Sequence, residues 1–257
     1  MPSFLSVAAL ACVIASTCIG GPSDGPLPGG VRQLVVSIGA DWNAARGQLQ
    51  CFERAPLGKW RVSSTPLPVL FGRHGLAWGR GVRGLDEPGP RKSEGDGRAP
   101  AGVFVLGRVF GHTPAAPAGA GVDYLQITDR DAWIDDPANP NYNRHVRIPA
   151  GQPLPAWFKS QRMRVGDPAH RWLVEVRHNA DPPEPGLGSA IFLHIRRGPN
   201  RTSSGCTTMA PDAIEWMIGW LRPESKPHYV LLPRAEYLAR WQSWGLPGPD
   251  QVGALLE

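Results

Sequence analysis

A cysteine and a histidine lie close together in the stretch FLHIRRGPNRTSSGCTTMA, where His194 follows apolar residues and Cys206 follows Ser203, Ser204 and Gly205. A thiol attacks a carbonyl only as the thiolate, and a neighbouring imidazole or helix N-terminus lowers the thiol pKa. The pattern predicts a cysteine nucleophile with histidine as its base. Taken alone, a cysteine after glycine or a histidine in an apolar strand more often has a structural role than a catalytic one.

The residues before the sulfur suit the stabilisation of an oxyanion. Gly205 lets the backbone approach a substrate closely. The N–H groups of Gly205 and Cys206, on the loop that includes Ser204, can donate to a tetrahedral intermediate. A helix predicted from Pro211 begins a few residues later, so its N-terminus is expected to face the sulfur and lower its pKa.

The sequence does not predict a metal site or a cofactor. It contains no HExxH motif, no CxxC motif and no close pair of histidines. The acidic stretch EGDG at residues 94–97 has only two carboxylates and lacks the ligand repeat of a calcium loop, which favours a turn.

Short strands bounded by turns are expected to position these residues, because β-branched and aromatic side chains recur between Gly- and Pro-containing stretches. The predicted strands span 32–39, 47–55, 59–66, 101–111, 122–129, 171–179, 189–197 and 227–233. Two helices are predicted, over 210–223 and 234–245. The long loops at 72–100 and 130–170 are where function is expected on a β scaffold. The fold class is therefore mainly β, with two C-terminal helices.

The composition is that of a globular protein, with 42% hydrophobic and 19% charged residues. The 31 glycines and 28 prolines disfavour a helical bundle. The net charge of +5 fits either nucleic acid or an acidic cell-envelope polymer as a partner. Because the basic residues are scattered and no recognition motif is present, we expect no nucleic-acid binding.

The N-terminal segment FLSVAALACVIASTCIG is apolar and uncharged. Its length is typical of a secretory signal, although an uncleaved anchor and a lipoprotein signal remain alternatives. We predict a signal peptide or anchor over 1–20, a flexible leader over 21–31, one catalytic domain over 32–245 and a tail over 246–257. The protein is expected to be exported to the periplasm or cell envelope. Cys51 and Cys206 then form either a disulfide or two free thiols.

Two blocks of the chain resemble a known family. The stretches GSAIFLHI and TSSGCTTM, with Ser203, Gly205 and Cys206 as S-x-G-C, resemble the L,D-transpeptidase (YkuD-like) catalytic domain. The upstream block RKSEGDGRAPAGVFVLGRVFG resembles that family's EGDG segment, and the resemblance runs over about residues 32–233. It implies a twisted β-sandwich or open barrel with the cysteine in a cleft.

The chain departs from the family pattern at two places. Ile195 stands where many members have Gly, and Thr207 and Thr208 stand where many have Arg. The missing Arg leaves open how a substrate carboxylate is held. Candidate substrate-binding residues, each with a solvated or structural alternative, are Ser203, His178, Arg196, Arg197 and Arg201.

The resemblance also implies a reaction. Cys206 would attack the carbonyl of an L-configured centre in a peptidoglycan stem peptide, and His194 would move the proton. An amine acceptor would then give a cross-link, and carbapenems would inhibit covalently. The alternatives are an envelope cysteine hydrolase, either a carboxypeptidase or an amidase, and a non-catalytic wall-binding module. The sequence leaves the acceptor and the oligomeric state open.

Overall fold

The structure is a computed structural model, and it describes residues 27–56 and 58–256. The predicted signal peptide or anchor over 1–20 lies outside the described residues, as do residues 21–26 of the predicted leader. Among the helices of the described part, none has the length and apolar character needed to cross a bilayer.

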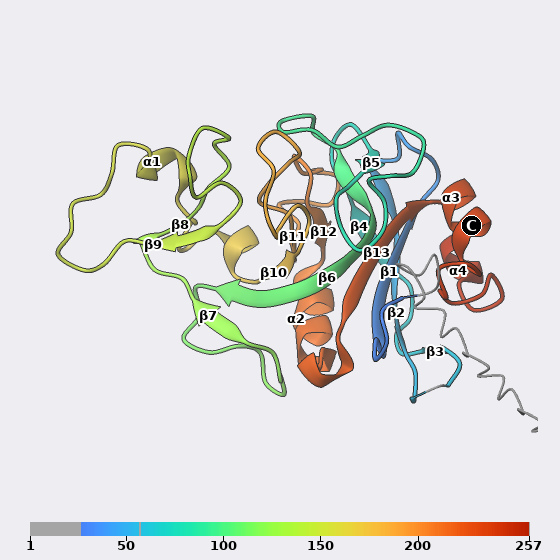
Figure 1. The fold of residues 1–257 in the computed structure, drawn as a ribbon. Coiled ribbons are helices and arrows are strands. Elements are labelled where there is room, and N and C mark those ends of the chain that lie inside the picture. The colour runs from blue at the N-terminus through green and yellow to red at the C-terminus, as the bar shows by residue number, and fades with distance from the viewer. Residues whose placement is uncertain (1–26, 57, 257) are drawn as a thin grey trace, which may run out of the picture.

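Eight strands close into a ring, which forms the body of the molecule (Figure 1). Around the ring they are β1 (Gln33–Gly39), β13 (His228–Pro233), β6 (Ala99–Gly111), β10 (Leu173–Val176), β11 (Phe192–Ile195), β12 (Thr207–Met209), β4 (Leu67–Leu70) and β2 (Arg46–Glu53). The pairing of β2 with β1 closes it. Neighbours are antiparallel except for β1 with β13 and β11 with β12, which are parallel.

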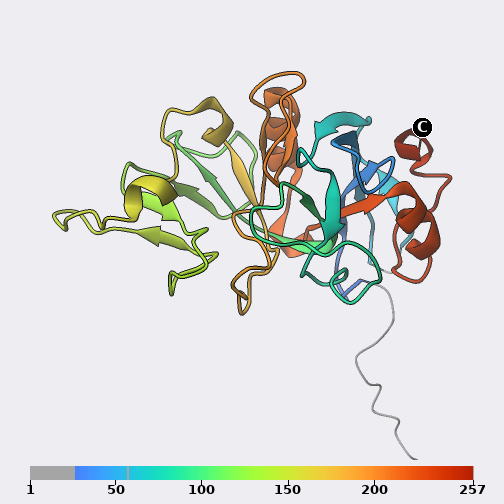
Figure 2. The ribbon, with the colours of Figure 1, turned by 90° about the horizontal axis from the view of Figure 1, so that it is seen from above.

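The other strands lie outside the ring. β3 (Arg61–Val62) pairs with β2, while β5 (Leu76–Trp78) and β7 (Tyr124–Gln126) pair with β6. β8 (Asp131–Trp133) and β9 (His145–Arg147) form a separate antiparallel hairpin. Together with α1 (Phe158–Gln161), this hairpin forms an arm that projects beyond the ring in both views (Figures 1 and 2). The short helix η1 (Pro168–His170) leads back from the arm and contacts β11.

Helices cover the ring near the C-terminus. α2 (Pro211–Trp220) follows β12 and buries Ile214, Met217 and Ile218 in the main core. The short helix η2 (Pro223–Ser225) leads into β13. α3 (Arg234–Arg240) contacts β1 and β13, and α4 (Gly253–Leu256) contacts β1 and β2. The predicted tail over 246–257 thus contains a helix that packs on the ring.

The mainly-β prediction is confirmed, and the ring closes completely where an open barrel was one alternative. β1 and β13 are buried along their whole length. Their near-continuous apolar sequences are what a parallel pair covered on both faces requires. The sequence-based assignment missed β4, β5, β8, β9 and β12, which have only three or four residues each.

Candidate active site

One cavity of about 450 Å³ contains both residues of the predicted pair, Cys206 and His194. The end of β11 and the loop before β12 form one wall, while the arm and the segment that returns from it form the opposite wall. The further lining residues are Lys92, Glu94, Gly95, Trp133, Asp135, Ser160, Gln161, Arg162, Met163, Arg164, His170, Leu173, Ser189, Ala190, Ile191, Phe192, Arg197, Ser204 and Gly205. The ring therefore supplies His194, Leu173 and Phe192, the loop before β12 supplies Cys206, and the long loops complete the cavity.

Cys206 is half-buried and is a neutral thiol at physiological pH. Its Sγ–H donates to the carbonyl oxygen of Ala190 at 3.4 Å. Burial raises the thiol pKa to about 11, although the N–H of Phe192 and the charge of Lys92 act in the opposite direction. The expectation of a lowered thiol pKa was wrong, because desolvation of the sulfur outweighs these two favourable groups.

The helix N-terminus does not reach the sulfur as the sequence suggested. Residues Thr207–Met209 are strand β12, and α2 begins only at Pro211. At about 3.3 Å per strand residue, this segment separates the helix end from Cys206 by roughly 10 Å. The helix dipole is short-ranged, so it contributes little at that distance.

His194 lies on β11 with its tautomer fixed by the backbone. Its Nδ1 contacts the carbonyl oxygen of Ile195 at 2.8 Å, and because a carbonyl only accepts, Nδ1 carries the proton. Nε2 is therefore the basic nitrogen. Burial lowers the imidazole pKa to about 4, so the ring is neutral at physiological pH. Within the described residues, no hydrogen bond joins the His194 ring to Sγ; the two groups share the cavity.

The loop that carries Cys206 is braced by Ser203. The N–H of Gly205 donates to Ser203 Oγ at 3.0 Å, and this hydroxyl donates to the carbonyl oxygen of Cys206. A Cβ at Gly205 would lie 3.1 Å from the carbonyl oxygen of Arg98, so the position is tightly packed. The Gly205 N–H is thus already engaged. The N–H groups of Ser204 and Cys206 have no partner in the described part of the chain, so they are the donors available to an oxyanion.

Of the predicted substrate-binding residues on the loop between β11 and β12, only Arg197 lines the cavity. Arg197 forms an ion pair with Asp167 at 2.6 Å. Arg201 is exposed and Ser203 is half-buried, and neither residue lines the cavity. Arg196 lines a different pocket, beside β2 and β4.

His178 lies behind the wall of the cavity and is only 2% exposed. Its Nδ1 accepts from the N–H of Arg80 at 3.2 Å, and its Nε2 donates to the carbonyl oxygen of Leu187 at 2.9 Å. Burial lowers its pKa to about 3. Both ring nitrogens are therefore occupied by backbone groups, which suits a structural role.

Sequence reasoning missed His170, a second imidazole in the cavity. Its Nδ1 accepts from the N–H of Arg164 at 3.1 Å, so its Nε2 carries the proton. Burial, and then the nearness of His194, lowers its pKa to about 4. The sequence GDPAHRW around it contains no signal that distinguishes it from a loop histidine.

Asn143 lies on the arm, and the sequence names it with Tyr142 only as a residue that could shape the cleft. Asn143 Oδ1 accepts from the indole of Trp133 at 3.1 Å and from the N–H of Ala190 at 3.0 Å. Its Nδ2 donates to the carbonyl oxygens of His178 and Asn179. This buried amide thus joins the arm to Ala190, whose carbonyl oxygen accepts the hydrogen bond from the Cys206 thiol.

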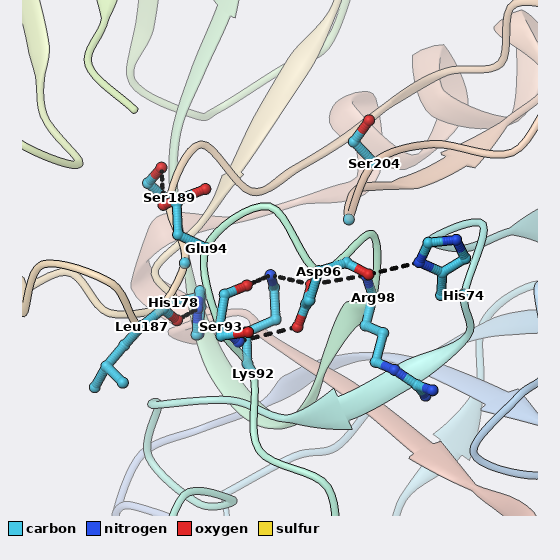
Figure 3. A network of polar contacts seen from close by, with 12 residues as sticks. His74, Lys92, Ser93, Glu94, Asp96, Arg98, His178, Leu187, Ser189 and Ser204 are labelled. Atoms are coloured by element: carbon cyan, nitrogen blue, oxygen red, sulfur yellow. Dashed lines mark hydrogen bonds and ion pairs between the residues drawn. The ribbon is translucent and has the colours of Figure 1, made fainter. Parts of the chain in front are cut away.

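The acidic groups of the cavity belong to the EGDG turn and the arm. Glu94 accepts hydrogen bonds from Tyr142 and, at 2.7 Å, from Ser189 (Figure 3). Burial raises the pKa of Asp135, with Glu94 adding to the effect. Across residues 27–56 and 58–256 there is no group of three or more His, Cys, Asp or Glu side chains suited to a metal ion. Cys51 and Cys206 are both free, so they do not form a disulfide.

Comparison with known proteins gives one match. The family model of the YkuD L,D-transpeptidase catalytic domain matches residues 29–230, which is most of the chain. No curated protein and no solved structure gives a significant match.

Proposed function

The chain belongs to the YkuD family of L,D-transpeptidase catalytic domains, and we propose that it is a cysteine acyltransferase acting on peptidoglycan stem peptides. The observation that carries the proposal is the pairing of Cys206 with a neutral, correctly protonated His194 in one cavity. The volume of this cavity, about 450 Å³, is within the range of sites that bind small ligands or short peptides. The envelope is then the expected place of action, and carbapenems are the expected covalent inhibitors.

In the first step Cys206 becomes acylated. Nε2 of His194 takes the proton from Sγ as the sulfur attacks the carbonyl carbon of the L-configured residue, and the π electrons of that carbonyl form an oxyanion. The N–H groups of Ser204 and Cys206 are the available donors to this oxyanion. When the intermediate collapses, the amine of the D-residue leaves with the proton from His194, and a thioester remains on Cys206.

In the second step the thioester is resolved. An amine of another stem peptide gives its proton to His194 and attacks the thioester carbonyl, and the cysteine leaves and regains its proton. The product is a 3-3 cross-link. If water takes the place of the amine, the same acyl-enzyme gives a free tripeptide, and the enzyme is a carboxypeptidase.

The charges around the cavity support a zwitterionic peptide as substrate. Arg197 and Arg164 lie on the lining with His170, while Glu94 and Asp135 lie on the part made by the EGDG turn and the arm. Arginine suits a peptide carboxylate through paired hydrogen bonds, and carboxylates suit an ammonium group. Diaminopimelate in a stem peptide carries both groups.

The test is a product assay with purified disaccharide tetrapeptide. We expect the wild-type protein to release the terminal D-residue and form a 3-3 cross-linked dimer, and we expect Cys206→Ala to form neither product. Release of tripeptide without dimer, even with excess amine acceptor, would make the protein a hydrolase. Wall binding by both proteins without any product would leave only the non-catalytic alternative.

A further inference from the structure

Lys92 is a buried lysine on the wall of the cavity. Its side chain is 4% exposed, and lysines are almost never buried to this extent without a specific partner. Its Nζ lies 2.6 Å from Oδ1 of Asp96 and 2.7 Å from the carbonyl oxygen of Ser93 (Figure 3). The residue belongs to the block RKSEGDG, a motif to which the reaction described above assigns no role.

The backbone of the EGDG turn holds the carboxylate of Asp96 in one position. Gly95 and Gly97 have φ values of +72° and +70°, in the left-handed region that favours glycine. The turn brings the N–H groups of Ser93 and Arg98 to the carboxylate of Asp96, at 2.9 and 2.8 Å. The carboxylate thus collects three donors, including the Lys92 ammonium, and fixes the ammonium in one position.

The two members of the Lys92–Asp96 ion pair lie at different distances from the cavity surface. Lys92 lines the cavity together with Cys206, whereas Asp96 does not line it. Two of the three N–H groups of Nζ are used by Ser93 and Asp96, and the third has no partner among the side chains and backbone that the structure describes. The cationic end of the pair is therefore the end presented to the cavity.

Stability alone is a weak reason for such a pair. The cost of removing two charges from water often exceeds their mutual attraction, and apolar residues of similar volume serve a core at least as well. A fixed positive charge beside a nucleophile has a clear chemical use, because it favours the anionic form of a neighbouring group. The sulfur of Cys206 must become anionic during acyl transfer, in a site where burial opposes that charge.

We propose that Lys92 is an electrostatic positioning residue for the reaction: held by Asp96, its ammonium stabilises the negative charge that forms on the sulfur of Cys206. This inference rests on the proposed function for its biological meaning. The effect of Lys92 on the ionisation of the Cys206 thiol, however, can be measured without any substrate. The charge of Lys92 also lowers the pKa of the Cys206 thiol, although burial raises that pKa by more.

Other charged groups face the same space and must be considered in a pH experiment. They are Asp96 and Glu94 on the turn, His178 behind the wall, His194 on β11, and Asp135, Arg162, Arg164, His170 and Arg197 elsewhere on the lining. The three imidazoles have pKa values of about 3 to 4, so they are neutral throughout the range above pH 6. A titration observed above pH 6 is therefore not theirs.

The experiment measures the alkylation rate of Cys206 by iodoacetamide from pH 6 to 11, read on the Cys206 peptide by mass spectrometry. Iodoacetamide is uncharged, so a lost cation changes the thiol and not the attraction of the reagent. We expect Lys92→Met to react about tenfold more slowly at pH 8, since one nearby charge moves a pKa by about one unit or more. Lys92→Arg should recover most of this loss. The exposed Lys59→Met is the matched control and should react like the wild type.

A second variant covers the case in which Lys92→Met fails to fold. Lys92→Met/Asp96→Asn removes the buried carboxylate together with its partner, and it should show the same slower alkylation. An unchanged pH profile in either folded variant would overturn the role of Lys92. The proposed function fails separately: a wild-type protein that forms no thioester with a tetrapeptide contradicts it, whatever the alkylation rates show.

Discussion

Cys206 and His194 are both neutral at rest, which sets how the proton must move. Burial raises the pKa of the thiol to about 11 and lowers the pKa of the imidazole to about 4. A preformed thiolate–imidazolium pair is therefore negligibly populated, and proton transfer must accompany attack on the substrate. In the proposed reaction, His194 is therefore a general base during attack and not a permanent counter-ion.

This distinction gives a prediction for His194→Gln. Acylation by a tetrapeptide should fall about 10²- to 10⁴-fold, because the base is lost. The pH midpoint of iodoacetamide alkylation at Cys206 should stay within about half a unit, because His194 does not hold the resting thiolate. Both rates can be followed on the Cys206 peptide by mass spectrometry.

The control is His112→Gln, since His112 lies in the segment after β6 and outside the cavity lining. It should leave both rates unchanged. A large upward move of the alkylation midpoint in His194→Gln would instead show that the two side chains form an ion pair at rest.

At the scale of elements, the arm and the ring form the site together. The ring places His194 on β11, opposite Thr208 of the parallel strand β12, and Cys206 directly precedes β12. The arm closes the cavity, and Asn143 ties it to Ala190 and to the segment that follows β10. Ala190 itself has a φ of +55°, a conformation that a non-glycine residue keeps only when its surroundings hold it.

Replacing Asn143 with Ala should therefore destabilise the packing of the arm against the segment that contains Ala190. The change leaves the indole of Trp133, the N–H of Ala190 and two carbonyl oxygens without their hydrogen bonds. We expect the free energy of unfolding to fall by about 2–4 kcal/mol and acylation to slow. Urea unfolding at pH 7 measures the first effect. Asn141→Ala, two residues away on the exposed turn, should cost less than about 0.5 kcal/mol. Equal losses for the two variants would contradict the role of Asn143.

The local signals in the sequence were sufficient to select Cys206 and His194, which the structure places in one cavity, and to predict most long strands. Cys206 and His194 lie within one short stretch, and β1, β6 and β13 have clear apolar runs. The strand β12 was not predictable, because three residues between a loop and a helix carry no periodicity, and its pairing with β4 is a single bridge.

The cavity walls depend on contacts between distant segments, which sequence patterns do not report. Lys92 belongs to a charged Gly-containing block that is typical of an exposed loop, but in the fold its side chain packs against the distant Gly188. His170 reaches the site because η1 contacts β11. The pKa of Cys206 depends on desolvation, which is a property of the folded surroundings and not of neighbours in the chain.

At the scale of the whole molecule, buried neutral imidazoles make the fold sensitive to acid. Burial lowers the pKa values of His170, His178 and His194 below the usual value of 6.5. The unfolded chain therefore binds more protons than the folded chain below about pH 6.5, so stability falls as the pH falls from there toward 4. Protonation of Asp131 reduces the stability only at a lower pH. Burial alone would raise the pKa of this carboxyl, but hydrogen bonds from His145, Arg147 and Thr128 lower it overall.

We expect the free energy of unfolding to be nearly constant from pH 8 to 7 and to fall continuously from pH 6.5 to 4. His178 alone, which is 2% exposed, should contribute about 3 kcal/mol of this loss at pH 4. Urea unfolding at half-unit pH steps measures the curve. The exposed His74→Gln should have the slope of the wild type. A stability that is flat between pH 6.5 and 4 would contradict neutral burial of these rings.

The most direct test of the whole account is mass spectrometry of the Cys206 peptide after the full-length protein meets a stem tetrapeptide and is quenched in acid. The expected result is a mass increase equal to the tripeptide acyl group on Cys206 in the wild type, and its absence in His194→Gln at the same time point. The contradicting result is a wild-type peptide that never carries the acyl group although iodoacetamide still alkylates the same sulfur.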